Sequence, residues 1–145
     1  MPAPAGPPVG VLRALLVAAG EILCAVPVHQ VRRVVRALPV HPLAGAAPEL
    51  LGLAEFTGEP IPVLDLGRLV NAPQGARPAA PVTVVAWAGP PNSRELVGLA
   101  ADAALEIVEI APAELVPSGA GAFCGDTSIA GRAVRVLNLE TLGAP

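Results

Sequence analysis

Short apolar runs alternate with clusters of turn residues along nearly the whole chain. The runs are rich in Val, Leu, Ile and Ala and are bounded by Gly, Pro, Asn or Ser, which is typical of short β-strands and not of long helices. We therefore expect about ten strands. They are predicted at residues 11–18, 22–26, 31–38, 51–54, 61–64, 82–88, 96–101, 102–110, 123–129 and 133–139.

Short helical turns are predicted directly after several of these strands. One starts at Pro27, since proline is tolerated in the first turn of a helix. Another starts at Asp65, whose carboxylate can accept hydrogen bonds from the free backbone N–H groups there. Two more are expected at residues 111–115 and 140–142. The same order of strand and turn occurs in both halves of the chain, which predicts an all-β fold.

Residues 48–70 carry the clearest local pattern in the chain. Apolar residues at 51–54 and 61–64 flank the sequence Thr57-Gly58-Glu59, which can supply a tight turn. The segment is therefore predicted to be a hairpin followed by a helical turn. No catalytic group is needed to explain it, so we interpret it as a structural and binding hairpin.

Two segments lack the apolar content of a folded element. Residues 1–10 consist mostly of Pro, Ala and Gly with almost nothing to bury, and we expect a disordered leader there. Residues 71–81 form a polar loop that contains Pro and Gly, and we expect the boundary between two subdomains near this loop. Residues 11–145 are expected to form a single domain.

Composition and charge narrow the picture further. The chain has 145 residues, of which 53% are hydrophobic and only 2% aromatic, so we expect one domain with an aliphatic core. The net charge of −3 gives no electrostatic reason to expect nucleic acid as a partner. Arg32, Arg33 and Arg36 form a basic cluster interleaved with valines, which we interpret as the solvated face of a strand.

Metal sites and hydrolytic sites are not indicated by the sequence. His29 and His41 have neither a further imidazole at metal-ligand spacing nor a cysteine cluster beside them. The serines lie in loops or hairpins and lack the Gly-x-Ser-x-Gly pattern that exposes a nucleophile: Ser93, Ser118 and Ser128. We therefore expect no catalytic residue, no metal and no cofactor.

The remaining chemistry concerns Cys24 and the longest apolar stretch. Cys24 lies inside an apolar strand pattern, so we expect a buried, inert thiol. Residues 12–28 are interrupted by Arg13 and Glu21, and no apolar run reaches the length of about 18 residues that a membrane-spanning helix needs. These features predict a cytoplasmic protein.

Four stretches, in order along the chain, resemble the motifs of a known family. They are EILCAVPVHQVRRVVR at 21–36, PELLGLAEFTGEPIPVLDLGRLV at 48–70, VGLAAD at 97–102 and GRAVRVLNLETL at 131–142. Together they resemble the CheW-like domain family. The resemblance implies an all-β fold of two intertwined five-stranded SH3-like β-barrels with a few short helical turns.

The resemblance also implies a function. It implies a non-enzymatic chemosensory adaptor that couples the helical tip of a methyl-accepting chemoreceptor to the regulatory domain of a CheA-type histidine kinase, without a cofactor, nucleic acid or direct membrane insertion. Such an adaptor would be cytoplasmic and recruited to membrane receptor arrays. Two alternatives stay open. One is an SH3-like scaffold of another signalling assembly, with altered or lost kinase binding, and the other is a small hydrolase with an unrecognised site.

Candidate binding residues follow from the same resemblance, position by position. The residues that it places in a receptor groove are Val31, Gly52, Phe56, Val82, Val97 and Ile107. The residues that it places on the kinase side are Arg33, Glu55, Thr57, Gly58, Glu59 and Ile61.

The chain departs from the family pattern at three of its positions. Thr57 stands where the family usually has arginine, and Arg33 stands where it usually has glutamate. We expect from this pair of changes that the charge polarity is inverted, with Arg33 facing Glu55. Asn138 replaces the family's closing aspartate, which we expect to cost only the charge of a helix cap.

Overall fold

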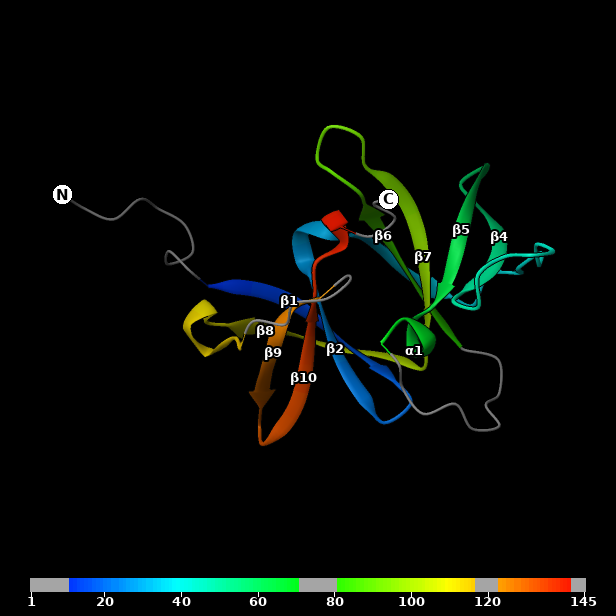
Figure 1. Ribbon diagram of the computed structural model, residues 1–145. Coiled ribbons are helices and arrows are strands. Elements are labelled where there is room, and N and C mark those ends of the chain that lie inside the picture. Colours follow the sequence, from blue (N-terminus) through cyan, green and yellow to red (C-terminus); the bar gives the residue numbers. More distant parts are fainter. Residues whose placement is uncertain (1–10, 71–80, 117–122, 142–145) are drawn as a thin grey trace.

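The computed structural model describes residues 11–70, 81–116 and 123–141 (Figure 1). The strands in these residues are β1 (Leu12–Ala19), β2 (Ile22–Pro27), β3 (Val31–Arg36), β4 (Leu50–Phe56), β5 (Glu59–Asp65), β6 (Val82–Ala88), β7 (Glu95–Ala101), β8 (Ala103–Ile110), β9 (Phe123–Ile129) and β10 (Arg132–Leu137). The helical turns are η1 (Val28–Gln30), α1 (Leu66–Leu69), η2 (Pro112–Glu114) and η3 (Leu139–Thr141). The predicted all-β fold class is confirmed.

The strands form two five-stranded sheets. The first sheet has the order β8-β1-β2-β10-β9, and the second sheet has the order β3-β6-β7-β5-β4. In Figure 1 the first sheet lies on the left and the second on the right. Because the first sheet contains both the first two and the last three strands, the two sheets are intertwined along the chain, as the family resemblance implies.

The loop at residues 71–81 does not divide the two sheets, in contrast to the expected subdomain boundary. Residues 71–80 lie outside the described residues, as does the expected leader at 1–10, but β5 and β6 on either side of this loop both belong to the second sheet. β5 pairs in parallel with β7, so the chain between them must return to the end of the sheet where β5 begins. The antiparallel strand β6 makes this return within the second sheet. The chain instead changes sheets between β2 and β3 and between β7 and β8.

One apolar core lies between the two sheets and receives side chains from both. We call it the shared core; its buried members are Val17, Ala19, Cys24, Val26, Leu66, Val70, Val84, Ala86, Ala88, Val97, Leu99, Ala101, Leu137 and Leu139. The strands β2, β6 and β7 are buried along most of their length, because one face contacts the shared core and the other contacts the interior of its own sheet. Burial on both faces explains why these strands have continuous apolar sequences without alternation.

Side-chain packing joins the two edges of the second sheet. β3 and β4 stand at opposite ends of the strand order, yet Val35 of β3 packs against the cluster that contains Phe56 of β4. Ile61 and Val85 are the other buried members of this cluster. The sheet is therefore curled around an apolar interior, as expected for an SH3-like barrel.

The β4–β5 hairpin turns through two residues with positive φ. Thr57 has a φ of 49° and Gly58 a φ of 85°, which is the arrangement of a type I′ turn. Glu59, which the sequence pattern assigned to the turn, is already the first residue of β5 and pairs with Phe56. The strong twist of a type I′ turn matches the twist of the two strands and fixes the register of the hairpin.

Asp65 caps α1 as its position predicted. Its Oδ1 accepts a hydrogen bond of 3.0 Å from the backbone N–H of Gly67, and Leu66 behind it is fully buried in the shared core. Arg68 of the same helix donates from Nη1 to the carbonyl oxygen of Pro48 at 2.7 Å. Its Nε lies 3.7 Å from Oδ2 of Asp65. The turn after β5 is thereby fastened both to the core and to the start of the hairpin.

A buried amide links the first change of sheet to the end of β10. Gln30 is 5% exposed, and its Oε1 accepts a hydrogen bond of 3.0 Å from the backbone N–H of Leu139. Its Nε2 donates to Asn138 Oδ1 at 3.3 Å, and the same oxygen accepts from the backbone N–H of Glu140 at 3.1 Å. Asn138 therefore still caps η3 in place of the family's aspartate, and it also satisfies a buried donor.

Cys24 is a buried free thiol, as predicted. It is fully excluded from solvent within the shared core. Burial raises the pKa of the Cys24 thiol from 9.0 to about 12, and the charge of Arg135 opposes this shift only in part. Since the thiolate is the reactive form of cysteine, Cys24 is chemically inert in the folded protein.

Gly52 allows a backbone segment to cover the free edge of β4. His41 and Leu53 form an isolated antiparallel bridge, with hydrogen bonds of 2.8 and 3.0 Å between their backbone groups. A Cβ atom on Gly52 would lie 2.2 Å from the carbonyl oxygen of His41, and the residue has a φ of 149°. Only glycine fits this position.

Gly52→Ala is therefore expected to destabilise the protein by about 3 kcal/mol or more, because the clash and the backbone strain act together. The matched control is Gly58→Ala, since Gly58 also has a positive φ of 85° but has open space around it. The control should lose only about 1 kcal/mol. Urea unfolding of both variants checks this, and equal losses would show that the contact with His41 is unimportant.

The stability of the protein is expected to fall as the pH rises above about 9. The unfolded chain then releases the Cys24 proton while the folded chain keeps it up to a pKa of about 12, so the folded state binds more protons. The free energy of unfolding should fall by up to about 1.4 kcal/mol per pH unit. All nine Lys and Arg positions are arginine and the chain has no tyrosine, so few other side chains titrate in this range.

Urea unfolding between about pH 8.5 and pH 11 measures this slope. The experiment is best done in a Cys124→Ser background, so that Cys24 is the only thiol. Cys24→Ala in the same background should remove the slope. A slope that persists without Cys24 would assign the pH dependence to other groups.

Candidate partner-binding site

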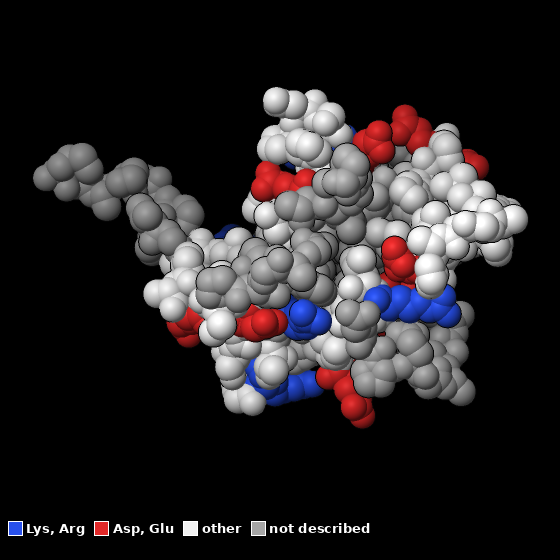
Figure 2. Space-filling view, in the orientation of Figure 1, with Lys and Arg blue, Asp and Glu red and all other residues white. Residues whose placement is uncertain are grey.

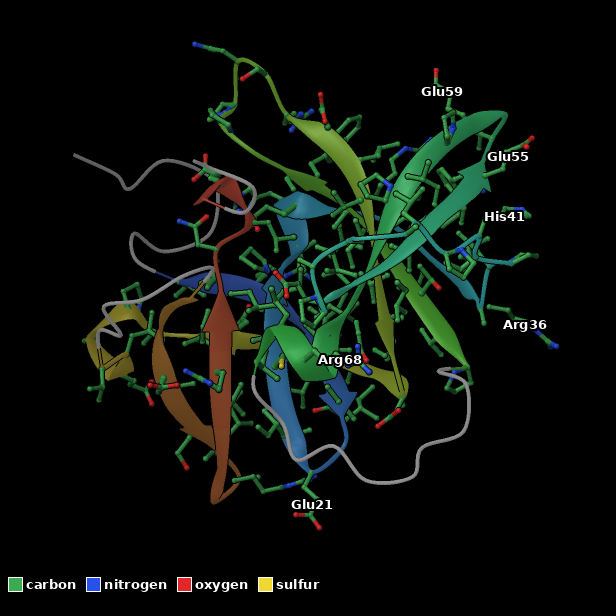
Figure 3. All side chains as sticks on the ribbon, turned by 45° about the vertical axis from the view of Figure 1, so that its right-hand side comes forward. Glu21, Arg36, His41, Glu55, Glu59 and Arg68 are labelled. Carbon is green, nitrogen blue, oxygen red and sulfur yellow. The ribbon has the colours of Figure 1, made fainter. Side chains whose placement is uncertain are left out.

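The free end of the β4–β5 hairpin presents most of the residues assigned to the kinase side. Glu55, Thr57, Gly58 and Glu59 are all exposed, and Figure 3 shows the side chains of Glu55 and Glu59 pointing away from the molecule at this end. Ile61 is 3% exposed and belongs to the apolar interior of the second sheet. Ile61 therefore packs under the hairpin in the apolar interior and is not part of its exposed surface.

The expected contact between Arg33 and Glu55 is wrong. The guanidinium carbon of Arg33 lies 5.9 Å from the centroid of the Phe56 ring, which belongs to the interior face of β4. Glu55 is the preceding residue of the same strand, so its side chain points to the opposite face. No ion pair joins the two residues in the described part of the chain. The cation of Arg33 faces an aromatic ring and not an acid.

The receptor-side residues divide into buried and accessible ones. Gly52, Phe56 and Val97 are buried, the last two at 6% and 8% exposure. Val31 and Val82 are half-buried, and Ile107 is 53% exposed. A partner can therefore contact three of the predicted receptor-side residues directly in this conformation: Val31, Val82 and Ile107.

Two of the accessible residues lie where the sheets meet. Val31 pairs with Ala86 of β6 and packs against the shared core from the second sheet. Ile107 pairs with Leu15 of β1, which packs against the same core from the first sheet. Val82 lies at the other end of β6 and pairs with Arg36, so it is separate from this pair. Val31 and Ile107 thus follow the line between the two sheets.

The sequence did not single out the exposed Leu105, which precedes Ile107 by two residues in β8. Leu105 is 49% exposed. The pairing of β1 with β8 shifts between Leu15 and Val17, where β8 carries an extra residue. Such a bulge breaks the alternation from which buried and exposed positions are inferred, so periodicity gave no signal for this residue.

Trp87 and Arg94 were also not predicted from the sequence as parts of a binding surface. The guanidinium carbon of Arg94 lies 4.5 Å from the centroid of the Trp87 ring, and Arg94 is exposed. A signal was available, because Trp87 is the single tryptophan of a chain with very few aromatic residues. A half-buried tryptophan near the end of a strand is a common feature of binding surfaces.

The charged side chains do not form a continuous basic surface on the face shown in Figure 2, where blue and red groups are interspersed among the described residues. Some arginines contact other groups of the same chain. The Nε atom of Arg135 lies 3.5 Å from Oδ1 of Asp126, and its Nη1 donates to the carbonyl oxygen of Val70 at 3.0 Å. The face in this view therefore presents no continuous basic patch of the kind that tracks a phosphate backbone.

Groups that could support catalysis or metal binding are scattered over the described residues. No cluster of three or more His, Cys, Asp or Glu side chains that could hold a metal occurs in this part of the chain. His29 and His41 are exposed, and within the same residues no serine is hydrogen-bonded to a histidine. None of the helices described is long and apolar enough to cross a membrane.

Comparison with known proteins agrees with this geometry. The chain is similar to scaffolding protein TtCheW from Thermoanaerobacter tengcongensis, whose crystal structure superposes with a TM-score of 0.75. The two share 17% sequence identity over 92% of this chain and 93% of that chain, so the likeness concerns the fold. A search of curated protein sequences found no match. The family model for the CheW-like domain matches residues 13–144, and the chain therefore belongs to the CheW-like domain family.

Proposed function

We propose that this protein is a chemosensory adaptor that couples chemoreceptors to a CheA-type histidine kinase by protein–protein binding alone. The observation that carries the proposal is the family match, which extends over nearly the whole chain. The described residues add two separate accessible surfaces, one at the end of the β4–β5 hairpin and one along the line between the sheets. An adaptor needs two such surfaces, because it must hold two partners at once. In this role the protein acts in the cytoplasm and is recruited to receptor arrays.

The β4–β5 hairpin is the surface we assign to the regulatory domain of the kinase. Its end is rigid, because the turn at Thr57 and Gly58 fixes the register and Phe56 anchors it in the apolar interior. Glu55 and Glu59 give this surface a negative charge. Charges around a contact contribute to partner choice and association rate more than to affinity.

The line between the sheets is the surface we assign to the helical tip of the receptor. Ile107 supplies an exposed apolar side chain from the first sheet, and Val31 supplies a half-buried one from the second. An amphipathic helix binds by placing apolar side chains in such a position. Phe56 and Val97 would then act indirectly, by holding the strands that carry this surface.

A second candidate is an SH3-like scaffold in another signalling assembly that has lost kinase binding. One observation favours it: Thr57 lacks the long cationic side chain of the family's arginine. Its hydroxyl donates a hydrogen bond of 2.7 Å to the carbonyl oxygen of Phe56, so it is engaged within the turn. The small hydrolase has no comparable support from the described residues.

Ile107→Glu is expected to weaken binding of a receptor cytoplasmic tip by about tenfold or more, because it places a charge in an apolar contact. Leu43→Glu is the matched control, since Leu43 is 44% exposed but lies in the segment that covers β4. Titration calorimetry with the receptor fragment measures both variants. Equal affinity of Ile107→Glu and the wild type would remove this surface from the receptor contact.

Thr57→Arg is expected to tighten binding of a conventional CheA regulatory domain by about tenfold, because it restores a charged hydrogen-bond donor at the end of the hairpin. Thr57→Gln gives a side chain of similar reach without charge and should not tighten binding. If the wild-type chain already binds as tightly as Thr57→Arg, the arginine is dispensable. If the wild type binds no kinase and only the arginine variant does, the second candidate function is favoured.

A further inference from the structure

Two exposed arginines, Arg33 of β3 and Arg94 directly before β7, lie over aromatic rings. Arg94 lies over Trp87 at 4.5 Å, and Arg33 lies over Phe56 at 5.9 Å. Both distances are measured from the guanidinium carbon to the ring centroid and lie within the range of a cation–π interaction. Phe56 and Trp87 are thus each covered by a guanidinium group.

The strand register places these two pairs next to each other. Arg33 of β3 pairs with Val85 of β6, and Trp87 follows Val85 by two residues on the same face of β6. Diagonal neighbours of this kind on adjacent strands are about 7–8 Å apart. Leu96 pairs with Trp87 across β6 and β7 and packs against the cluster that contains Phe56. We call the residues Arg33, Phe56, Trp87 and Arg94 the arginine–aromatic surface.

The two arginines differ from those that stabilise the fold. Arg68 and Arg135 each contact an acid and a backbone carbonyl oxygen, whereas Arg33 and Arg94 form no ion pair within the described residues. A guanidinium group that stacks on a ring keeps the N–H donors in its plane directed outward. Stacking also limits its rotamers, which lowers the entropy cost of binding a carboxylate.

We propose that the arginine–aromatic surface binds an acidic segment of a partner protein, with carboxylates seated against Arg33 and Arg94. The inference deepens the proposed function, on which it rests, by naming the chemistry of the partner at this end of the second sheet. Bidentate pairing of guanidinium with carboxylate is the geometry that such pre-positioned groups favour. Side chains two residues apart in an extended segment are spaced by about 7 Å, which is close to the expected spacing of Arg33 and Trp87, the ring over which Arg94 lies.

Nearby acids favour separated carboxylates over a dense polyanion. Glu59 pairs with Phe56 at the end of the hairpin, so it lies on the same face as the arginine–aromatic surface, and Glu55 lies on the opposite face. The chain as a whole carries a net charge of −3. A nucleic acid would bring many phosphates close to Glu59, whereas a peptide can place a single carboxylate beside each arginine.

The test uses the full-length protein and the peptide acetyl-Leu-Glu-Leu-Glu-Leu-amide, with acetyl-Leu-Gln-Leu-Gln-Leu-amide as its neutral match. Trp87 is the single tryptophan and lies under Arg94, so its fluorescence reports binding directly. The acidic peptide should change this fluorescence in a saturable way, and its affinity should be lower at high salt. The neutral peptide should cause no such change. A thymidine hexanucleotide should bind more weakly than the acidic peptide.

Arg33→Gln and Arg94→Gln should each weaken binding of the acidic peptide by about tenfold. Arg36→Gln is the matched control, because Arg36 is exposed on the same strand but is not over a ring, and it should bind as the wild type does. Since Trp87 fluorescence changes with Arg94 itself, the affinities of the variants are measured by titration calorimetry. Unfolding curves verify that each variant is folded.

Equal binding of the two peptides, or unchanged affinity in both arginine variants, overturns the inference. Tighter binding of the oligonucleotide than of the acidic peptide also overturns it. Binding of the kinase regulatory domain and of the receptor tip is measured in parallel with the wild type. If both partners fail to bind while the acidic peptide binds, the proposed function is wrong and the inference about the arginine–aromatic surface holds. If both partners bind while the acidic peptide does not, the inference is wrong and the proposed adaptor function holds.

Discussion

Burial of the central strands on both faces is the constraint on which the rest of this structure depends. β2, β6 and β7 contribute one face to the shared core and the other to the interior of their own sheet. Small and medium aliphatic side chains can fill two layers on either side of a strand, whereas large rings cannot do so at every position. The low aromatic content and the abundance of Val, Ala and Leu follow from this arrangement.

The same constraint determines where a partner can bind. A strand that is buried on both faces and paired on both edges offers nothing to another protein, so contacts are confined to hairpin ends, edge strands and the line where the sheets meet. The backbone at His41, which Gly52 admits, covers the middle of the β4 edge, and the end of the β4–β5 hairpin remains accessible. Residues of the central strands, such as Val97, influence a partner only through the positions of their neighbours.

Turns and helix caps, which depend on neighbouring residues, could be predicted from the sequence. Side-chain contacts between different strands could not. The turn at Thr57 and Gly58 and the cap at Asp65 depend on neighbouring residues, and both were predicted. The faces of Arg33 and Phe56 depend on how the sheet curls, which no local pattern records, and the predicted pair with Glu55 failed for that reason. Exposure of Leu105 was missed because a bulge interrupts the alternation in β8.

The two departures from the family pattern have a simpler physical meaning than an inverted salt bridge. Replacing glutamate by Arg33 and arginine by Thr57 removes both members of the family's acid and base, and the new cation faces the ring of Phe56 and not Glu55. An exposed ion pair contributes only about 0–1 kcal/mol, and a cation over a ring contributes a similar amount while also covering apolar surface. Arg33 can therefore settle over Phe56 without a loss of stability, and it remains available to an acid that another protein supplies.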